Sequence, residues 1–175
     1  MNKNWDEIRK LAVQYADENI SNRGMNCSES VFEALIRSGA IEGSLEDVSF
    51  ATGFGGGGGG VGLTCGALAA GILANSMVHG RKKPAESVNR MELKENLYKR
   101  YNNLVSSFVT VVGSGLCREI IDEFPDGYKD EKTRPNCKRI VIAAAGIAVD
   151  YLKMDSEAVS NLEYDPGVVG IKNWI

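Results

Sequence analysis

The residues of this sequence best suited to chemistry are its four cysteines, Cys27, Cys65, Cys117 and Cys137. Thiolates act as nucleophiles, form disulfides and bind soft metal ions and iron–sulfur clusters. The four are separated by 38, 52 and 20 residues, and no Cys-x-x-Cys pair occurs. These spacings argue against a zinc ribbon, a ferredoxin-type cysteine run and a thioredoxin-like motif. They leave open a site assembled from distant segments.

All four cysteines are predicted at or near the start of a helix. Three follow a residue type that is preferred at the N-cap, in the pairs Asn26-Cys27, Thr64-Cys65 and Asn136-Cys137. Cys117 lies two residues after Gly115, in the first turn of its own predicted helix. Unpaired backbone N–H groups and the helix dipole favour negative charge there, so we expect the pKa of these thiols to fall below about 8.5.

Each cysteine also shares a helix face with apolar residues three and four positions later. Cys27 aligns with Val31, for example, and Cys65 aligns with Leu68 and Ala69. These relations turn each sulfur toward the apolar side of its helix, so the four thiols could meet at one place. The plainer alternative is that they are small core residues, since cysteine is among the most buried residue types.

A run of six glycines, Gly55 to Gly60, precedes Cys65. No Gly-Lys-Ser/Thr follows it and no strand is predicted before it, which argues against a phosphate-binding loop. We expect the run to hold no regular structure, since glycine is costly inside helices. Backbone without Cβ atoms can approach an anion closely. The backbone of Gly55, Gly56, Gly57, Gly58 and Gly66 is therefore predicted to line a cofactor beside the cysteines.

The remaining sequence predicts an all-α fold, a single-domain helical bundle over residues 1–175 with a Gly-rich loop and its cysteines at helix N-termini. Apolar residues recur with helical period over residues 5–20, 27–38, 44–53, 64–79, 85–112, 116–124 and 137–152. The Ala- and Gly-rich segment 64–79 indicates close approach between helices. A polar loop is expected over 125–136. In the tail from Ser156, apolar residues show little helical periodicity, so the sequence does not place it.

Composition narrows the classes of partner. The chain has 175 residues, 43% hydrophobic residues and a net charge of −3. This balance argues against nucleic-acid binding and leaves no polybasic patch for an anionic membrane. Neither a secretory signal nor a membrane span is predicted. We therefore expect a cytoplasmic protein, and stable structural disulfides are rare in that compartment.

Several segments together resemble one known family. They are Asn26-Cys27-Ser28-Glu29-Ser30-Val31, Gly53-Phe54-Gly55-Gly56, Cys65-Gly66-Ala67-Leu68-Ala69-Ala70-Gly71, Cys117-Arg118-Glu119 and Cys137. In this order they resemble the C_GCAxxG_C_C family of redox-active proteins, with Thr64 where the family name suggests Gly. The resemblance implies redox chemistry at the cysteines. Related sequence in a split-Soret multihaem cytochrome is associated with an iron–sulfur centre. This chain has no Cys-x-x-Cys-His for haem attachment.

These observations lead to one principal hypothesis and three alternatives. The first is a small redox protein whose cysteines ligate an iron–sulfur cluster, for electron transfer to a partner protein or for sensing. The second is thiol–disulfide exchange between pairs of these cysteines, with Cys65 as nucleophile. The third is a helical binding protein with structural cysteines, and the fourth is a four-thiolate zinc site. The long helix 85–112 and the apolar tail would suit a homodimer interface.

Overall fold

The computed structural model describes residues 3–83 and 93–172. Its longer helices are α1 (Trp5–Asn22), α2 (Cys27–Arg37), α5 (Gly66–His79), α7 (Tyr98–Val112) and α9 (Thr133–Leu152). Shorter helical segments are η1 (Leu45–Val48), α3 (Ser49–Thr52), α4 (Gly55–Gly58), η3 (Leu93–Leu97), α8 (Cys117–Asp122), η4 (Gly127–Lys129), α10 (Ser156–Ser160) and η5 (Pro166–Val168). The only β pairing within the described ranges is an isolated bridge between Thr64 and Leu116, so the predicted all-α class is confirmed.

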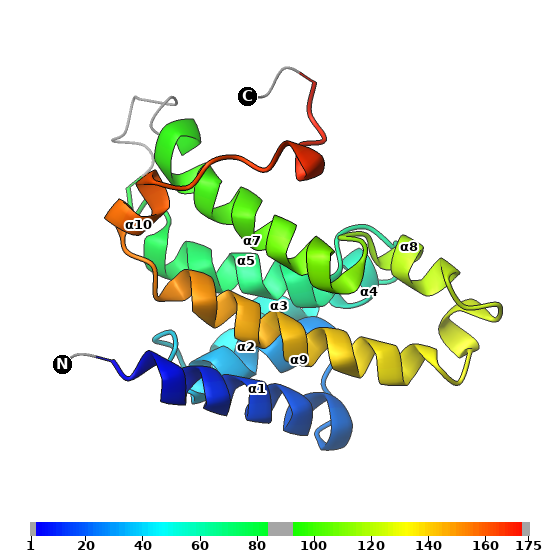
Figure 1. Ribbon diagram of the computed structural model, residues 1–175. Helices are drawn as coiled ribbons and strands as arrows, with labels where there is room; N and C mark the ends of the chain where they lie inside the picture. The colour runs from blue at the N-terminus through cyan, green and yellow to red at the C-terminus, as the bar shows by residue number, and fades with distance from the viewer. Residues whose placement is uncertain (1–2, 84–92, 173–175) are drawn as a thin grey trace.

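Helix α9 is the centre of the bundle and packs against α1, α2, α5 and α7 (Figure 1). The predicted close approach of the Ala- and Gly-rich segment is confirmed at its contact with α9. A Cβ atom placed on Gly71 would lie 3.4 Å from the Cβ of Ala148. One turn later, Asn75 Nδ2 donates to the carbonyl oxygen of Ala148 over 3.2 Å. Small residues thus allow the two backbones to share a hydrogen bond.

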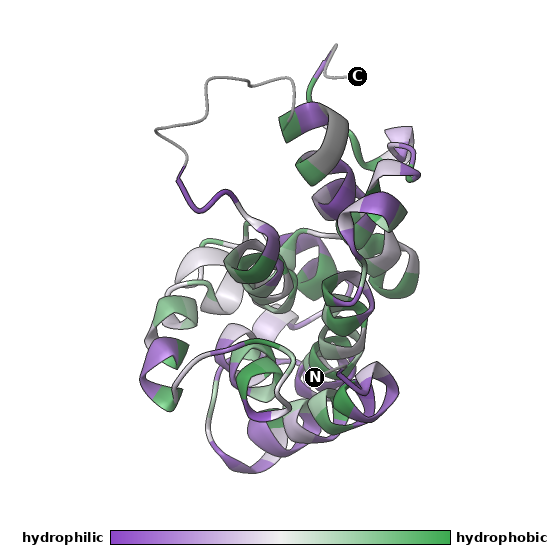
Figure 2. Cartoon of the chain, turned by 90° about the vertical axis from the view of Figure 1, so that its left-hand side faces the viewer, coloured by the Kyte–Doolittle hydropathy of each residue, from purple (hydrophilic) through white to green (hydrophobic). Residues whose placement is uncertain are grey.

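The core is built from the apolar faces of these helices. Its largest fully buried apolar side chains include Phe32, Leu35, Leu104, Phe108 and Ile140. Figure 2 shows hydrophobic and hydrophilic residues alternating around the helices, as expected for helices with one buried face. No helix of the part that the structure describes is long and apolar enough to cross a membrane.

One buried carboxylate joins α1 to α2. Glu33 is 1% exposed, and its two carboxylate oxygens accept from Asn19 Nδ2 and Arg23 Nη1, each over 2.5 Å. A buried charge that lacks such partners is strongly destabilising. This cluster therefore fixes α1 against the helix that carries Cys27.

Three predicted boundaries need correction. Helix α9 begins at Thr133 rather than Cys137, because Pro135 falls in the first turn, where a missing N–H costs nothing. The expected helix 44–53 is divided into η1 and α3. Of the expected helix 85–112, residues 85–92 lie outside the described residues, and a π-helical turn over Leu93–Leu97 precedes α7.

The C-terminal tail crosses the outer side of α7 (Figure 1). Asn102 of α7 holds it by two hydrogen bonds to the backbone of Asp165, at 2.7 Å from the N–H and 3.3 Å to the carbonyl. Asn103 Nδ2 donates to the carbonyl of Glu163 over 2.8 Å. The sequence did not place this segment, because its contacts are polar and long-range. A homodimer through α7 and the tail stays a prediction.

The core predicts a clear mutational contrast along α7. Phe108 is 1% exposed, so Phe108→Ala should lower the free energy of unfolding by about 3–5 kcal/mol through lost burial and a cavity. Val111 on the same helix is 50% exposed, so Val111→Ala should change the free energy of unfolding by less than about 0.5 kcal/mol. Urea denaturation followed by circular dichroism measures both, and equal losses would contradict this core.

Candidate functional site

The start of α2 fixes Cys27 beside the glycine run. Asn26 is the N-cap, and its Oδ1 accepts from the N–H groups of Ser28 and Glu29, both at 3.0 Å. Glu29 Oε2 accepts from the Asn26 N–H in return, which completes a capping box. Asn26 Nδ2 also donates to the carbonyl of Thr52 over 3.2 Å. Cys27 is thus the first residue of a helix whose cap is tied to α3.

The glycine run forms a compact turn rather than the expected irregular loop. Glycines 56 to 60 all have positive φ, between 62° and 91°, which L side chains rarely adopt. The N–H groups of Gly57 and Gly58 both donate to the carbonyl of Phe54 at 3.2 Å, and that of Gly59 donates to Gly55 at 2.8 Å. These N–H groups are already engaged and are not available to a cofactor.

Two glycines of the predicted lining contact cysteines directly. A Cβ atom on Gly57 would lie 2.8 Å from the Cβ of Cys117, and one on Gly66 would lie 2.6 Å from Cys27 Sγ. Real Cβ atoms essentially never make such contacts, so only glycine fits at these positions. Gly55 packs against the Asn26 side chain, whereas a Cβ on Gly56 or Gly58 would meet nothing within 4 Å. Of the five glycines predicted to line a cofactor, Gly57 and Gly66 therefore lie against cysteine side chains, and Gly55, Gly56 and Gly58 do not.

Cys65 and Cys117 are brought together by the isolated bridge. The N–H of Cys65 donates to the carbonyl of Gly115 over 2.8 Å, and the N–H of Cys117 donates to Leu63 over 2.6 Å. Cys65 is the N-cap residue of α5, one position earlier than predicted, and Cys117 is the first residue of α8. This pairing joins segments about 50 residues apart in the chain, and no local sequence signal predicts it.

Cys137 differs from the other three because it lies in the second turn of α9 rather than at a helix start. Its electrostatic environment nevertheless places it in the same group. The pKa of Cys137 is raised to about 11, mainly by burial and then by the charges of Cys27 and Cys117. Charges act strongly only over short distances, so Cys137 is a neighbour of both.

The expected lowering of thiol pKa is wrong for three of the four cysteines. The pKa of Cys65 is raised to about 12, mainly by burial and then by the charge of Cys27. The backbone N–H groups of Ala67 and Leu68 act in the opposite direction and lower its pKa, but their effect is smaller than that of burial. Burial followed by the charge of Cys27 also raises the pKa of Cys117. Desolvation therefore outweighs the helix N-terminus, since Cys65 is only 6% exposed.

The four thiols are free, and the described residues form no site for a metal ion. Cys27, Cys65, Cys117 and Cys137 form no disulfide. Within residues 3–83 and 93–172, no three His, Cys, Asp or Glu side chains are arranged to hold a metal ion. Zn–S bonds of about 2.3 Å would bring ligand sulfurs to within about 4 Å of one another. What the structure provides is a group of neighbouring thiols on α2, α5, α8 and α9.

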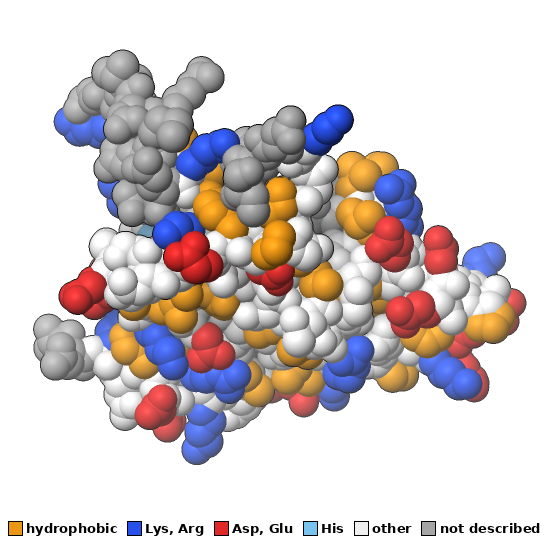
Figure 3. All heavy atoms as spheres, turned by 45° about the horizontal axis from the view of Figure 1, so that its top comes forward, with side chains coloured by type: hydrophobic (Ala, Val, Ile, Leu, Met, Phe, Trp, Pro, Cys, Tyr) orange, Lys and Arg blue, Asp and Glu red, His pale blue; other side chains and the backbone are white. Residues whose placement is uncertain are grey.

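Exposed apolar side chains flank the glycine turn. Phe54, Val61 and Leu63 are 40%, 65% and 50% exposed, and we call these three residues the apolar rim. Figure 3 shows hydrophobic side chains gathered at the α4–α8 end of the molecule, on the right of the view. On the same face, acidic and basic residues alternate without a patch of one sign. An apolar rim beside a functional site is typical of a surface that contacts another protein.

The fold and this site define a class: a helical protein with a group of free thiols enclosed by glycine backbone. The sequence model of the family described as "Putative redox-active protein (C_GCAxxG_C_C)" matches residues 25–151. The chain belongs to this family, and the match covers all four cysteines and the glycine turn. No curated protein and no solved structure matches the chain.

A glycine series separates contact from backbone strain. Gly57→Ala combines left-handed strain with overlap on Cys117 and should lower the free energy of unfolding by about 2–5 kcal/mol. Gly58→Ala has the strain without a contact and should cost about 1–2 kcal/mol. Gly53→Ala brings neither strain nor overlap, so its free energy of unfolding should be within about 1 kcal/mol of that of the wild type. Denaturant unfolding of the three variants would contradict the close contact if Gly57→Ala and Gly58→Ala were equal.

The raised pKa values predict a loss of stability at alkaline pH. Below about pH 8.5, thiols are protonated in both folded and unfolded chains. At higher pH the unfolded chain ionises, while the pKa of Cys65, about 12, keeps its thiol protonated in the folded protein. The metal-free protein should therefore lose stability progressively from about pH 8.5 upward. Urea titrations at several pH values should show a shallower decline for Cys65→Ala, and parallel declines would refute this origin.

Proposed function

We propose that this protein is a small redox protein in which Cys27, Cys65, Cys117 and Cys137 hold an iron–sulfur cluster for electron transfer or sensing. The observation that carries the proposal is the meeting of thiols from four helices at one glycine-lined region. Gly57 and Gly66 lack the Cβ atoms that would otherwise occupy space beside Cys117 and Cys27.

The donor set fits such a group. All four candidate ligands are thiols, the ligand type that iron–sulfur clusters take. A cluster places iron and sulfide between its cysteines, so its ligands lie farther apart than those of one zinc ion. When bound, such a cluster supplies one-electron redox chemistry.

The protein's own residues would set the conditions for binding. Cys65 is 6% exposed, which keeps water from that ligand. Burial raises the pKa of Cys65 to about 12 and that of Cys137 to about 11, so both thiols must release protons when a cation binds. The apolar rim is the surface on which a redox partner would approach, and a cytoplasmic location would suit free thiols.

Thiol–disulfide exchange is the second candidate, supported by four free thiols. In that chemistry two thiols give up two protons and two electrons to an oxidant and form one disulfide bond. The choice of Cys65 as nucleophile is not supported, because a pKa of about 12 leaves almost no thiolate at neutral pH. A helical binding protein with inert cysteines is the remaining alternative.

Anaerobic purification followed by absorption spectroscopy and metal analysis tests the proposal. We expect a brown protein with absorption at about 400 nm and about two to four iron atoms per chain. Each variant of the set Cys27→Ser, Cys65→Ser, Cys117→Ser and Cys137→Ser should lose at least half of the bound iron. Val61→Ser, on the same rim but with no thiol removed, should retain it.

The other outcomes identify the alternatives. A colourless, metal-free protein that also fails anaerobic reconstitution would refute the cluster. Thiol counts that then fall from four to two or none under mild oxidation would support thiol–disulfide exchange. One zinc per chain without colour would indicate a structural four-thiolate site.

A further inference from the structure

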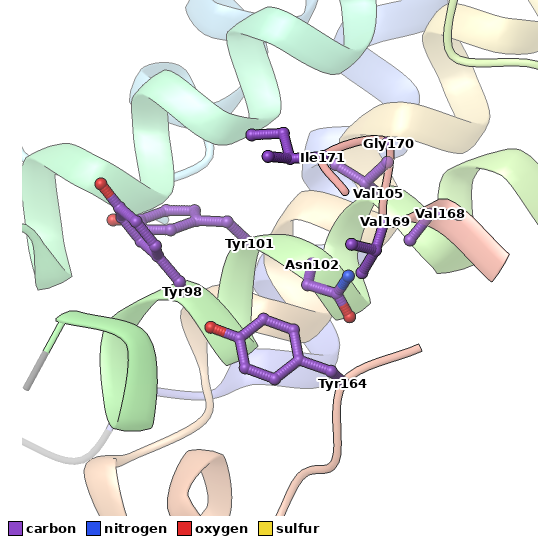
Figure 4. Close-up of a pocket in the computed structure, with 9 residues that line it drawn as sticks. All are labelled: Tyr98, Tyr101, Asn102, Val105, Tyr164, Val168, Val169, Gly170 and Ile171. Carbon is purple, nitrogen blue, oxygen red and sulfur yellow. The ribbon is translucent and has the colours of Figure 1, made fainter. Parts of the chain in front are cut away.

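Two further features lie outside the cysteine side chains. The first is an open, tyrosine-lined cavity between α7 and the C-terminal tail, with Tyr98, Tyr101 and Tyr164 in its wall (Figure 4). No cysteine lines this cavity, and nothing in its wall selects one class of ligand. The second is the segment of residues 49–55, which consists of α3 and the three residues after it and which we call the lid. It leads directly into the glycine turn, which lies beside α8 (Figure 1).

The lid adjoins the thiols at the start of α5. A Cβ atom on Gly66 would lie 2.6 Å from Cys27 Sγ and 2.7 Å from the carbonyl oxygen of Phe54. The Cys27 sulfur and this carbonyl of the lid therefore flank the same point beside the first turn of α5. Cys65, the N-cap residue of that helix, is only 6% exposed. The lid thus closes the side of the site on which α2 and α5 begin.

Little apolar surface holds the lid in place. Of residues 49–55, only Ala51 is buried. Phe50 and Phe54 are 63% and 40% exposed, so the two largest side chains of the lid contribute little to the core. Segments with few buried apolar groups open locally at a lower free-energy cost than the core does. The lid is therefore the part of the site that is easiest to displace.

Three hydrogen bonds to the start of α2 hold the lid instead, and we call them the latch. Ser28 Oγ donates to the carbonyl of Ala51 over 2.7 Å, and Asn26 Nδ2 donates to the carbonyl of Thr52 over 3.2 Å. Thr52 Oγ1 donates to Glu29 Oε1 over 2.7 Å. The two bonds of Thr52 are exposed to solvent, so water competes for the same groups.

The glycine turn that follows the lid is suited to act as its hinge. Glycines 58 to 60 have positive φ, and a Cβ atom on any of them would meet nothing within 4 Å. Glycine also has the greatest backbone freedom of all residues. Beyond the turn the chain is anchored, because the carbonyl of Leu63 accepts from the N–H of Cys117 over 2.6 Å. The turn can therefore absorb a movement of the lid while Leu63 and Cys117 stay in place.

We propose that the lid opens by breaking the latch and that this opening gives reagents access to the thiol of Cys65. The reagent is an iron or iron–sulfur species if the site holds a cluster, and an oxidant if it forms a disulfide. The inference therefore goes beyond the proposed function and does not require the cluster. Thr52 and Glu29 are then positioning residues that set how often the site is accessible.

Thiol labelling of the full-length, reduced and metal-free protein at about pH 8 tests this inference. Iodoacetamide is added at several urea concentrations below the unfolding transition, and mass spectrometry follows Cys65 and Cys117 separately. We expect the Cys65 rate to increase with urea much less steeply than global unfolding measured by circular dichroism, because opening the lid exposes little surface. A Cys65 rate that follows global unfolding would overturn the inference, whatever the iron content of the purified protein.

Thr52→Val removes one hydroxyl of the latch and keeps the shape of the side chain. It should raise the labelling rate of Cys65 about three- to tenfold, the effect of one lost hydrogen bond, and leave the rate of Cys117 unchanged. Ser106→Ala is the matched control, since it removes a hydroxyl that donates to the Asp165 carboxylate, between α7 and the tail. The inference fails if this control raises the Cys65 rate as much, or if Cys117 accelerates equally in Thr52→Val.

Gly53→Ala tests the lid in the opposite direction. Gly53 has a φ of −68°, and a Cβ atom there would meet nothing within 4 Å, so alanine fits the closed lid. Alanine also restricts the backbone of the open lid, so labelling of Cys65 should slow about two- to fivefold. An unchanged or faster rate would count against opening at this segment.

Discussion

The close approach of glycine backbone to cysteine side chains is the constraint on which the rest of the site depends. Gly57 lies against Cys117 and Gly66 lies against Cys27, at distances that no Cβ atom would permit. This contact lets α2, α4, α5 and α8 begin or end in one small region. Positive φ angles along the glycine turn serve the same purpose, because they turn the chain back within a few residues. The run of glycines is thus explained by space and backbone conformation rather than by anion binding.

Burial and the helix N-terminus act on the thiol of Cys65 in opposite directions, and burial dominates. The dipole and free N–H groups favour a thiolate at a helix start, but a side chain removed from water resists ionisation. Neighbouring thiols add to this resistance, because each negative charge would repel the next. A cation placed among them would reverse both effects. The same residues are therefore poor free nucleophiles and good candidate ligands.

Helix α7 connects two parts of the molecule with different characters. Its C-terminal end leads through Gly113 and Gly115 to Cys117, whereas its first half supports the tail and the tyrosine-lined cavity. The buried face between them, with Leu104 and Phe108, holds α7 on α9. The thiol group and the cavity can be studied separately because no cysteine lines the cavity.

The sequence by itself determined the helical class, most helix positions and the resemblance to the redox-active family that carries the four cysteines. Those predictions rest on local signals: apolar period, the N-cap Asn26 and the breaking of helices by glycine. Local signals could not reveal that Cys65 and Cys117 are joined by the Thr64–Leu116 bridge, since that pairing is long-range. They also could not give the pKa direction, because desolvation depends on how deeply the folded chain buries each thiol. The place of the tail was likewise decided by tertiary contacts, through side-chain amides on α7 whose partners lie about 60 residues away.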